Sequence, residues 1–324
     1  MNLTKKMLKQ REFLLFSVVL LIFITLSFVS PFFLTRSNMM AVLISLSIEV
    51  IIAVAMANLI ISGGFDLSVG SVVCFSGMLS GLLWTMGIPP EVSILIGILA
   101  GMAIGTFNGV LVAVIGVGPF VATLASLYIF RGIVYALTQG KSIAGLPDAF
   151  RMLGQYTVLG VQMPIIFAVI FVILGDIILR RVRFFRQSYY IGSNEKAAQL
   201  SGIKVRKMKI INYMLTGTFA GFAGVVQAGR LGAAMSTTGE GLEMKVLTAV
   251  IIGGASLKGG EGTVLGAFLG SILMALVTNA VNLLGVNVYW QTFIVGITLL
   301  TAVLVDSLGR MRRSSQTTMR VKKT

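Results

Sequence analysis

The sequence predicts an all-α polytopic membrane protein, with about ten transmembrane helices in two related halves and with glycine-interrupted segments. The first observation behind this prediction is composition. Of the 324 residues, 56% are hydrophobic and only 11% are charged, whereas soluble globular domains carry about 25% charged residues. The second is a series of apolar runs of about 20 residues, the length that crosses a bilayer. The third is the gathering of Lys and Arg in three segments that alternate with apolar blocks.

The apolar runs, taken in chain order, define the predicted helices. Six precede a basic interior loop and four follow it: about 12–34, 39–61, 68–87, 92–115, 119–138 and 163–179, and then about 210–231, 246–257, 262–284 and 288–308. The first run is too long for the core of a signal peptide, so we expect it to be retained. The run 246–257 is the weakest, because it is short and runs into Gly253-Gly254. The polar stretch 139–162 is expected to be a loop on the outer face.

Positive charge predicts the orientation of the chain. It is concentrated in the tails 1–11 and 310–324 and in the loop 180–209, and cytoplasmic loops of membrane proteins carry an excess of Lys and Arg. We therefore expect both termini and this loop to be cytoplasmic, which requires an even number of crossings between them; six and four satisfy this. Residues 1–324 then form a single transmembrane domain. The net charge of +15 is explained by this orientation, so no nucleic-acid partner is expected.

Several kinds of chemistry are disfavoured by what the sequence lacks. It has no histidine and one cysteine, Cys74, so we expect no disulfide within the chain, no metal site and no His-activated nucleophile. Gly140-Lys141-Ser142 resembles the end of a phosphate-binding loop, but Tyr135 stands where the motif requires a glycine. The glycines of 253–262 lack the strand–turn–helix context of a dinucleotide site. We predict no catalytic residue and no bound cofactor in this chain, and an intramembrane enzyme is disfavoured.

The basic loop contains a short helix with recognisable ends, over residues 194–202. Asn194 is a good N-cap, Glu195 suits the positive end of the helix dipole, and Gly202 is suited to end the helix in the left-handed conformation. A rod of about 12 Å is too short to be stable alone, so it needs a surface to pack on. The spacing by itself leaves open an ordinary juxtamembrane connector.

Two glycine-rich stretches, one in each half, read alike. Ile61–Val72 and Ile252–Val264 both run from apolar residues into Gly-Gly, then Asp or Ser, Leu, a glycine-containing loop and Ser/Thr-Val. Paired broken segments of this kind indicate a transport pathway, because unwound backbone at membrane depth must be buried in protein or line a cavity. The candidate pathway and break residues are Gly63, Gly64, Asp66, Ser68, Asn108, Gly253, Gly254 and Glu261. Whether the halves are parallel or inverted is left open.

A few ionisable residues fall within or beside predicted spans. Asp66 and Glu261 are expected to cap backbone N–H groups at the breaks, and Asp176 to form an i,i+4 pair with Arg180. Glu49 and Arg131 are the candidates for a buried pair or a polar pathway. Glycines at every third or fourth position also predict close helix packing; they are Gly97, Gly101, Gly105 and Gly109 in one helix and Gly217, Gly221 and Gly224 in another.

On these residues the chain resembles the permease subunit of a bacterial ATP-binding-cassette sugar importer, of the ribose, galactose and autoinducer-2 type. The resemblance covers about 12–309. It is carried by Gly63-Gly64-Phe65-Asp66-Leu67-Ser68-Val69-Gly70-Ser71-Val72, Gly105-Thr106-Phe107-Asn108-Gly109, Pro119-Phe120-Val121-Ala122-Thr123-Leu124, Gly192-Ser193-Asn194-Glu195-Lys196-Ala197-Ala198, Leu200-Ser201-Gly202-Ile203, Gly253-Gly254-Ala255-Ser256-Leu257 and Gly260-Glu261-Gly262-Thr263-Val264.

The resemblance implies partners that composition does not show. It implies location in the bacterial inner membrane, a second permease copy (the same chain or a related one), a separate cytoplasmic ATP-binding-cassette subunit that binds ATP-Mg, and a periplasmic solute-binding protein. The helix 194–202 would then be the coupling helix that docks on the ATPase subunit, through Asn194, Glu195, Ala197, Ala198, Leu200 and Gly202. The solute would be a monosaccharide or a similar small polyol-like molecule. Which one it is would be decided largely by the binding protein.

An ion-coupled secondary transporter is the main alternative, since it also has broken helices and repeats. It needs membrane-embedded carboxylates to carry the coupling ion, and Glu49 is the only deep candidate in the sequence. Transport in liposomes separates the two hypotheses. The first requires ATP and a second chain, whereas an ion gradient alone suffices for the second.

Overall fold

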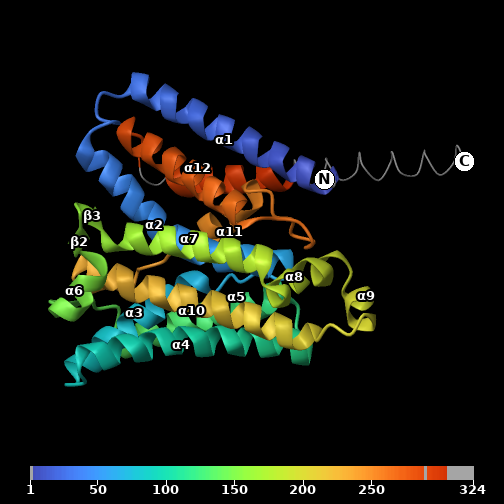
Figure 1. The fold of residues 1–324 in the computed structure, drawn as a ribbon. Coiled ribbons are helices and arrows are strands. Elements are labelled where there is room, and N and C mark those ends of the chain that lie inside the picture. Colours follow the sequence, from blue (N-terminus) through green and yellow to red (C-terminus); the bar gives the residue numbers. More distant parts are fainter. Residues whose placement is uncertain (1–2, 288–289, 305–324) are drawn as a thin grey trace, which may run out of the picture.

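The long apolar runs of the chain form helices that lie side by side in a computed structural model (Figure 1). The structure describes residues 3–287 and 290–304, with side chains from residue 12 onward. The predicted tail 310–324 lies outside the described residues, as do the side chains of the predicted tail 1–11. The predicted last span is described from Trp290 to Leu304.

Helices dominate the described chain, and four two-residue strands pair outside them. The helices are α1 Leu3–Val29, α2 Arg36–Ile61, α3 Val69–Thr85, α4 Pro90–Val110 with the π-helical continuation η1 Leu111–Ile115, α5 Pro119–Thr138, α6 Asp148–Gly154, α7 Met163–Arg181, α8 Arg183–Ser193, α9 Glu195–Leu200, α10 Val205–Leu231, α11 Leu242–Ile252, α12 Val264–Leu283, and Trp290–Leu304. Strands β1 Ile143–Ala144 and β4 Ala233–Ala234 pair antiparallel, as do β2 Thr157–Val158 and β3 Val161–Gln162.

Six helices of the described chain are long and apolar enough to cross a membrane: α1 from Glu12, α2, α4 with η1, α5, α7 and α12. The chain is therefore a multi-pass helical membrane protein. α3 and Trp290–Leu304 are shorter apolar helices. α10, at 27 residues, is about 40 Å long but more polar, and α11, at 11 residues, is about 16 Å long. Each predicted run thus coincides with a helix, while the number of crossings stays a prediction.

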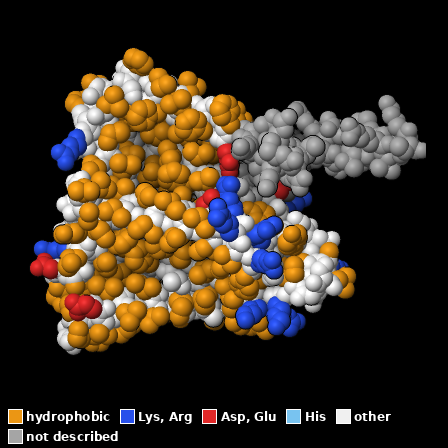
Figure 2. Space-filling view, in the orientation of Figure 1, with side chains coloured by type: hydrophobic (Ala, Val, Ile, Leu, Met, Phe, Trp, Pro, Cys, Tyr) orange, Lys and Arg blue, Asp and Glu red, His pale blue; other side chains and the backbone are white. Residues whose placement is uncertain are grey.

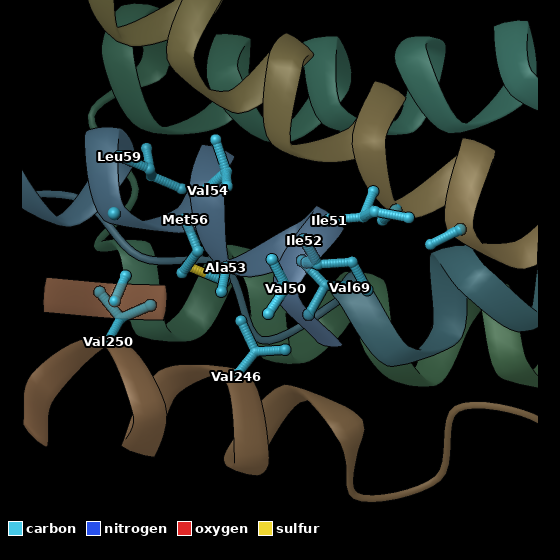
Figure 3. Close-up of a cluster of buried hydrophobic side chains, with 14 of the residues drawn as sticks. Val50, Ile51, Ile52, Ala53, Val54, Met56, Leu59, Val69, Val246 and Val250 are labelled. Carbon is cyan, nitrogen blue, oxygen red and sulfur yellow. The ribbon is translucent and has the colours of Figure 1, made fainter. Parts of the chain in front are cut away.

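Helix α2 is the centre of the core. Apart from Ser47, Glu49 and Asn58, its sequence is apolar from Leu46 onward, and every residue from there to Ile61 is buried, as expected of a helix surrounded by protein. Helices α7, α10, α11 and α12 surround it. Figure 3 shows Val50 of α2 opposite Val246 of α11, with Val250 further along α11.

The predicted glycine stripes bring α4 and α10 into backbone contact. A side chain on Gly217 would overlap the backbone of Gly101 and Gly105, so neither helix has room for a methyl group there. Two other glycines of the stripes face α3 instead. Gly97 packs on Ser80, and Gly224 packs on the backbone of Val73. The stripes therefore fix α3, α4 and α10 as one close-packed group.

The basic loop 180–209 forms one end of the molecule, as α8 and α9, and the hairpin β2–β3 with α6 lies at the opposite end (Figure 1). Figure 2 shows Lys and Arg side chains gathered beside the α8–α9 end, while hydrophobic side chains cover the sides of the helices. At the end of α7, Arg180 Nε lies 2.7 Å from Asp176 Oδ1, which confirms the predicted i,i+4 pair.

Candidate functional site

The short helix α9 has the ends that its sequence predicts. Asn194 precedes it in an extended conformation, and its side-chain Oδ1 accepts a hydrogen bond of 3.0 Å from the N–H of Ala197. Gly202 follows it with φ of 83°, a left-handed conformation that favours glycine, and its N–H donates to the carbonyl of Gln199 at 3.0 Å. The helix proper has six residues, Glu195–Leu200.

The two faces of α9 differ from the expectation in one respect. Ala198 is only 4% exposed and packs with Ile191, Val205 and Met208. A direct contact of Ala198 with a docking partner is therefore wrong for this structure, because its side chain holds α9 against α8 and α10. Leu200 is 90% exposed, and Asn194, Glu195, Ala197 and Gly202 are also exposed. The exposed side of α9 is thus built around Leu200.

Glu195 ties the start of α9 to α10. Its Oε2 lies 2.6 Å from Nζ of Lys209, in an ion pair whose carboxylate is about half exposed. An exposed pair of this kind contributes little to stability, and it orients the rod more than it stabilises it.

The two glycine-rich loops lie side by side, and the end of α8 touches both. The N–H of Gly260 donates to the carbonyl of Ile61 at 2.8 Å. A side chain on Gly192 of α8 would overlap that same carbonyl and the N of Gly260, and one on Gly259 would lie 2.9 Å from the N of Gly63. We call this contact of Ile61–Gly63, Gly192 and Gly259–Gly260 the glycine junction. It joins segments about 130 and 200 residues apart in backbone-to-backbone packing.

The four glycines of the two predicted breaks differ in backbone conformation and in their contacts. Gly63 and Gly254 have φ of 82° and 93° and so need the conformational freedom of glycine. Gly64 lies close to the Leu59 side chain and to Tyr213 Oη, and a side chain on Gly253 would overlap the carbonyl of Gly266.

A second tie between α8 and the later loop comes from Tyr189. Its hydroxyl donates to the carbonyl of Gly262 at 2.9 Å. Burial raises the pKa of Tyr189 to about 12, so the phenol stays protonated and keeps donating at neutral pH. In the same loop, the carbonyl of Glu261 accepts from the N–H of Ser256 at 3.1 Å.

Asp66 is buried in a polar cluster at the loop between α2 and α3. Its Oδ1 accepts from the N–H of Ser68 at 2.7 Å and from Ser68 Oγ at 2.6 Å, which confirms the predicted cap. Asn108 of α4 donates to Ser68 Oγ at 2.9 Å and to Asp66 Oδ2 at 3.3 Å, and it accepts from Ser126 of α5. Because these groups satisfy one another, the cluster fastens the loop to α4 and α5.

Arg131 does not pair with Glu49. Its guanidinium donates to the carbonyls of Ser236 at 3.0 Å, Thr238 at 2.8 Å and Gly70 at 3.3 Å. The first two belong to segment 232–241, which joins α10 to α11. Gly239 of this segment packs on Gly70, which lies about 22 Å along α3 from its end at Thr85. Segment 232–241 therefore descends deep between the helices with its backbone held by an arginine.

Segment 232–241 was not among the candidate residues predicted from the sequence. The signal was present, because three glycines (Gly232, Gly239 and Gly241) and the polar run Ser236-Thr237-Thr238 fall between two apolar runs. All three glycines have positive φ. A stretch of this composition is typical of a surface loop. Only its contacts with the neighbouring helices show that it lies deep between them.

Glu49 faces a cavity of about 160 Å³ beside segment 232–241. The polar part of the lining comes from three directions: Ser45 and Glu49 of α2, Gln227 and Arg230 of α10, and Thr238, Glu240 and Lys245. Glu49 is 7% exposed, and its Oε1 has no hydrogen-bond partner within the described protein. No group of three His, Cys, Asp or Glu side chains in the described ranges is placed to hold a metal ion.

Comparison with known proteins points to transport. Residues 38–303 match the family described as branched-chain amino acid transport system / permease component. The chain is 36% identical to the ribose import permease protein of Bacillus subtilis, over 87% of this chain and 88% of that one. It is 35% identical to the ribose import permease protein of Escherichia coli, over 94% and 95%. It is 36% identical to an L-arabinose ABC transporter permease protein of Azospirillum brasilense, over 91% and 87%. No solved structure matches.

Proposed function

The chain belongs to the permease family that its residues 38–303 match, and from this premise we propose that it is the membrane-spanning subunit of an ATP-driven importer of a monosaccharide or a similar polyol-like solute. The chain itself hydrolyses nothing. ATP-Mg is bound and hydrolysed by a separate cytoplasmic ATP-binding-cassette subunit, and a periplasmic binding protein delivers the solute. The permease acts in the bacterial inner membrane with a second copy. Relatives named as ribose and L-arabinose permeases support the sugar class.

The observation that carries the proposal is the continuous contact from α9 to both glycine-rich loops. Leu200 stands exposed on a capped rod, Ala198 fixes that rod to α8, and Gly192 at the end of α8 touches the loops that follow α2 and α11. A partner that binds Leu200 is therefore connected, through α9 and α8, to the loops that follow α2 and α11. An ordinary juxtamembrane connector has no need of such a junction.

The glycine junction transmits a displacement of α8 because its backbone atoms are already in contact. Backbone atoms of three segments touch at Gly192, and close-packed interfaces respond to a push by moving as units and not by deforming. A shift of α8 on ATP binding must then move Ile61, Gly260 or both. Those residues end α2 and begin the approach to α12, so the shift reaches the helices around the core.

Ten membrane segments in two parallel halves fit the proposed orientation. α2 and α11 both end at a glycine-rich loop, α3 and α12 both begin after one, and the two loops meet at the same end of the molecule. This common direction supports parallel halves. α11 is too short to cross alone, and segment 232–241 supplies the remaining depth. The termini and the α8–α9 end are cytoplasmic. Ser193→Cys and Ser314→Cys are expected to resist an impermeant thiol reagent added to intact spheroplasts.

Reconstitution tests the function directly. The permease, its ATPase subunit and its binding protein are placed in liposomes, and uptake of radiolabelled ribose, allose and arabinose is measured with ATP and, separately, with a proton or sodium gradient. We expect uptake to require ATP and the ATPase chain. Uptake driven by an ion gradient alone would support the ion-coupled alternative instead.

Leu200→Glu tests the docking surface. We expect the ATPase subunit to be lost on co-purification, because a charge replaces the exposed apolar side chain at the centre of the rod. Leu159→Glu is the matched control, since Leu159 is fully exposed at the opposite end of the molecule. Equal recovery of the ATPase with both variants would leave α9 as a connector and remove this support for the proposal.

A further inference from the structure

We propose that the cavity between α2, α10 and segment 232–241 is a resting site for the sugar midway across the membrane, where charged and polar side chains bind its hydroxyl groups. This inference rests on the proposed import function and gives it a location. We call this space the mid-membrane cavity; its volume is about 160 Å³.

The position of the cavity is central. Glu49 lies about 20 Å from the start of α2 at Arg36 and about 18 Å from its end at Ile61, so it stands near the middle of a helix that spans the membrane. The opposite wall is segment 232–241, whose backbone is unwound at this depth. Such backbone occurs inside a membrane only where protein buries it or where it lines a polar cavity. Part of the backbone of segment 232–241 is buried in protein, where Arg131 donates to its carbonyls. The rest lines the cavity.

The lining has the chemistry that a neutral polyol needs. Two acidic residues, Glu49 and Glu240, and two basic residues, Arg230 and Lys245, line the cavity, so its formal charges cancel. A single metal ion or a charged solute gains little from a balanced site. A sugar hydroxyl both donates and accepts hydrogen bonds, so it can bind a carboxylate and a cation together. The buried Oε1 of Glu49, which lacks a partner in the described protein, marks a place where a hydroxyl would be bound.

The site is suited to weak and temporary binding. No aromatic side chain is among the residues that line it, so the sugar ring finds no surface to stack on. A solute in a transport path must be bound strongly enough to enter and weakly enough to leave. The volume of about 160 Å³ leaves room for a small solute.

The cavity is reachable from the protein surface. Ser45 of α2 and Glu240 of segment 232–241 both line the cavity and are exposed, so we take them to mark its mouth. The mouth is at membrane depth, where lipid does not hydrate polar groups.

Filling the cavity is the first test. Ser45→Trp places a large ring in the mouth, and Leu43→Trp is the matched control, because Leu43 lies two residues away on the exposed side of the same helix. ATP-driven uptake of the best transported sugar among ribose, allose and arabinose is measured in liposomes with the complete importer. We expect Ser45→Trp to reduce uptake at least about tenfold, the equivalent of 1.4 kcal/mol, with the ATPase subunit still bound. Leu43→Trp is expected to behave as the wild type.

Charge balance supplies a second readout. Glu49→Gln and Lys245→Met each leave the lining with an unpaired charge, and the double variant restores neutrality. We expect each single change to raise the KM for transport about tenfold, as for the loss of a hydrogen bond to a charged group, and the double variant to recover part of the loss. Glu91→Gln, at an exposed site outside the cavity, is the charge control.

Thiol labelling tests occupancy without relying on transport rates. Thr238→Cys is made in a Cys74→Ser background and treated with a water-soluble methanethiosulfonate, with and without the transported sugar. We expect labelling that the sugar slows, and no labelling of Leu43→Cys. Wild-type uptake by Ser45→Trp, or failure of saturating sugar to slow labelling at Thr238→Cys, would overturn the proposal. If Leu200→Glu still abolishes ATP-driven uptake in those experiments, the cavity assignment alone fails and the import function stands.

Discussion

Two places along α2 differ in how they are packed. At Ile61, where the helix ends, the glycine junction leaves no room for a methyl group on Gly192. At Glu49, about 18 Å away along the same helix, polar side chains surround the mid-membrane cavity. The molecule is close-packed where we propose that force enters and hollow where we propose that solute passes. One rigid helix connects the two.

The sequence builds these two places with different uses of glycine. At the junction, glycines from three segments remove side chains so that backbones touch. In segment 232–241, Gly239 and Gly241 take left-handed conformations that let the chain turn at depth, and Arg131 then replaces a helix as the donor to its carbonyls. Glycine content alone therefore does not distinguish a close backbone contact from the wall of a cavity. The neighbours of each glycine decide.

The largest effect is expected at the junction. Gly192→Ala adds one methyl group that would overlap the carbonyl of Ile61 and the N of Gly260, and overpacking of this kind costs about 1–3 kcal/mol. We expect ATP-driven uptake to fall to background while the protein still inserts and retains its ATPase. Gly132→Ala is the control, because nothing lies within 4 Å of a methyl group there. Wild-type uptake with Gly192→Ala would show that the junction has slack, and the contrast with the cavity would disappear.

The next effect concerns the wall of the cavity. Arg131→Met removes the guanidinium donor from the carbonyls of Ser236, Thr238 and Gly70, and of these Ser236 still accepts from the Cys74 thiol at 3.1 Å. A buried polar group without a partner costs about 1–3 kcal/mol. We expect a lower thermal unfolding temperature in detergent and weaker uptake, with Arg131→Lys intermediate because an ammonium group cannot serve three carbonyls in a fork. Unchanged melting of Arg131→Met would mean that segment 232–241 holds its shape without the arginine.

Local features of both places could be predicted from the sequence. The ends of α9 follow from the capping preferences of Asn194 and Gly202, and the close packing of α4 and α10 follows from the spacing of their glycines, although the spacing did not say that they pack on each other. The two Gly-Gly loops were identified by their similarity to each other. The capping and packing predictions succeed because each depends on residues close in sequence or on a simple repeat, whereas the two helix breaks stay a prediction.

The remaining features depend on contacts between distant residues. Arg131 was predicted as a buried polar residue, but its carbonyl partners lie about 100 residues away in a segment with no helical period. Ala198 was expected on the outer face of α9, and it faces inward because Ile191 and Met208 come from the helices on either side. Glu49 was identified by its charge, while the cations opposite it come from α10 and α11. Tertiary structure alone decides which polar groups meet.

A moderate effect is expected between the two places, at the polar cluster. Asn108→Leu keeps the size of the side chain but removes its donors to Ser68 and Asp66 and its acceptor for Ser126. Asp66 is still bound by Ser68, so we expect a loss of about 1–3 kcal/mol in the free energy of unfolding. Ser126→Ala breaks only one of these bonds and should cost less. An equal loss for both variants would show that the contact of Asn108 with α5 is the important one.

The smallest effect is expected at the surface, where α9 meets α10. The Glu195–Lys209 pair is 2.6 Å long but its carboxylate is about half exposed, and exposed pairs contribute about 0–1 kcal/mol. Glu195→Gln should therefore change the melting temperature little, and less still at high salt, because salt screens exposed charges. Asp176→Asn, which breaks the exposed pair with Arg180, is the matched control. ATPase co-purification separates two roles for Glu195. If Glu195→Gln keeps the ATPase, the carboxylate only orients the rod, and Leu200 remains the centre of the docking surface. If the ATPase is lost while melting is unchanged, Glu195 itself contacts the partner, and the rigid path to the junction begins one turn earlier than Leu200.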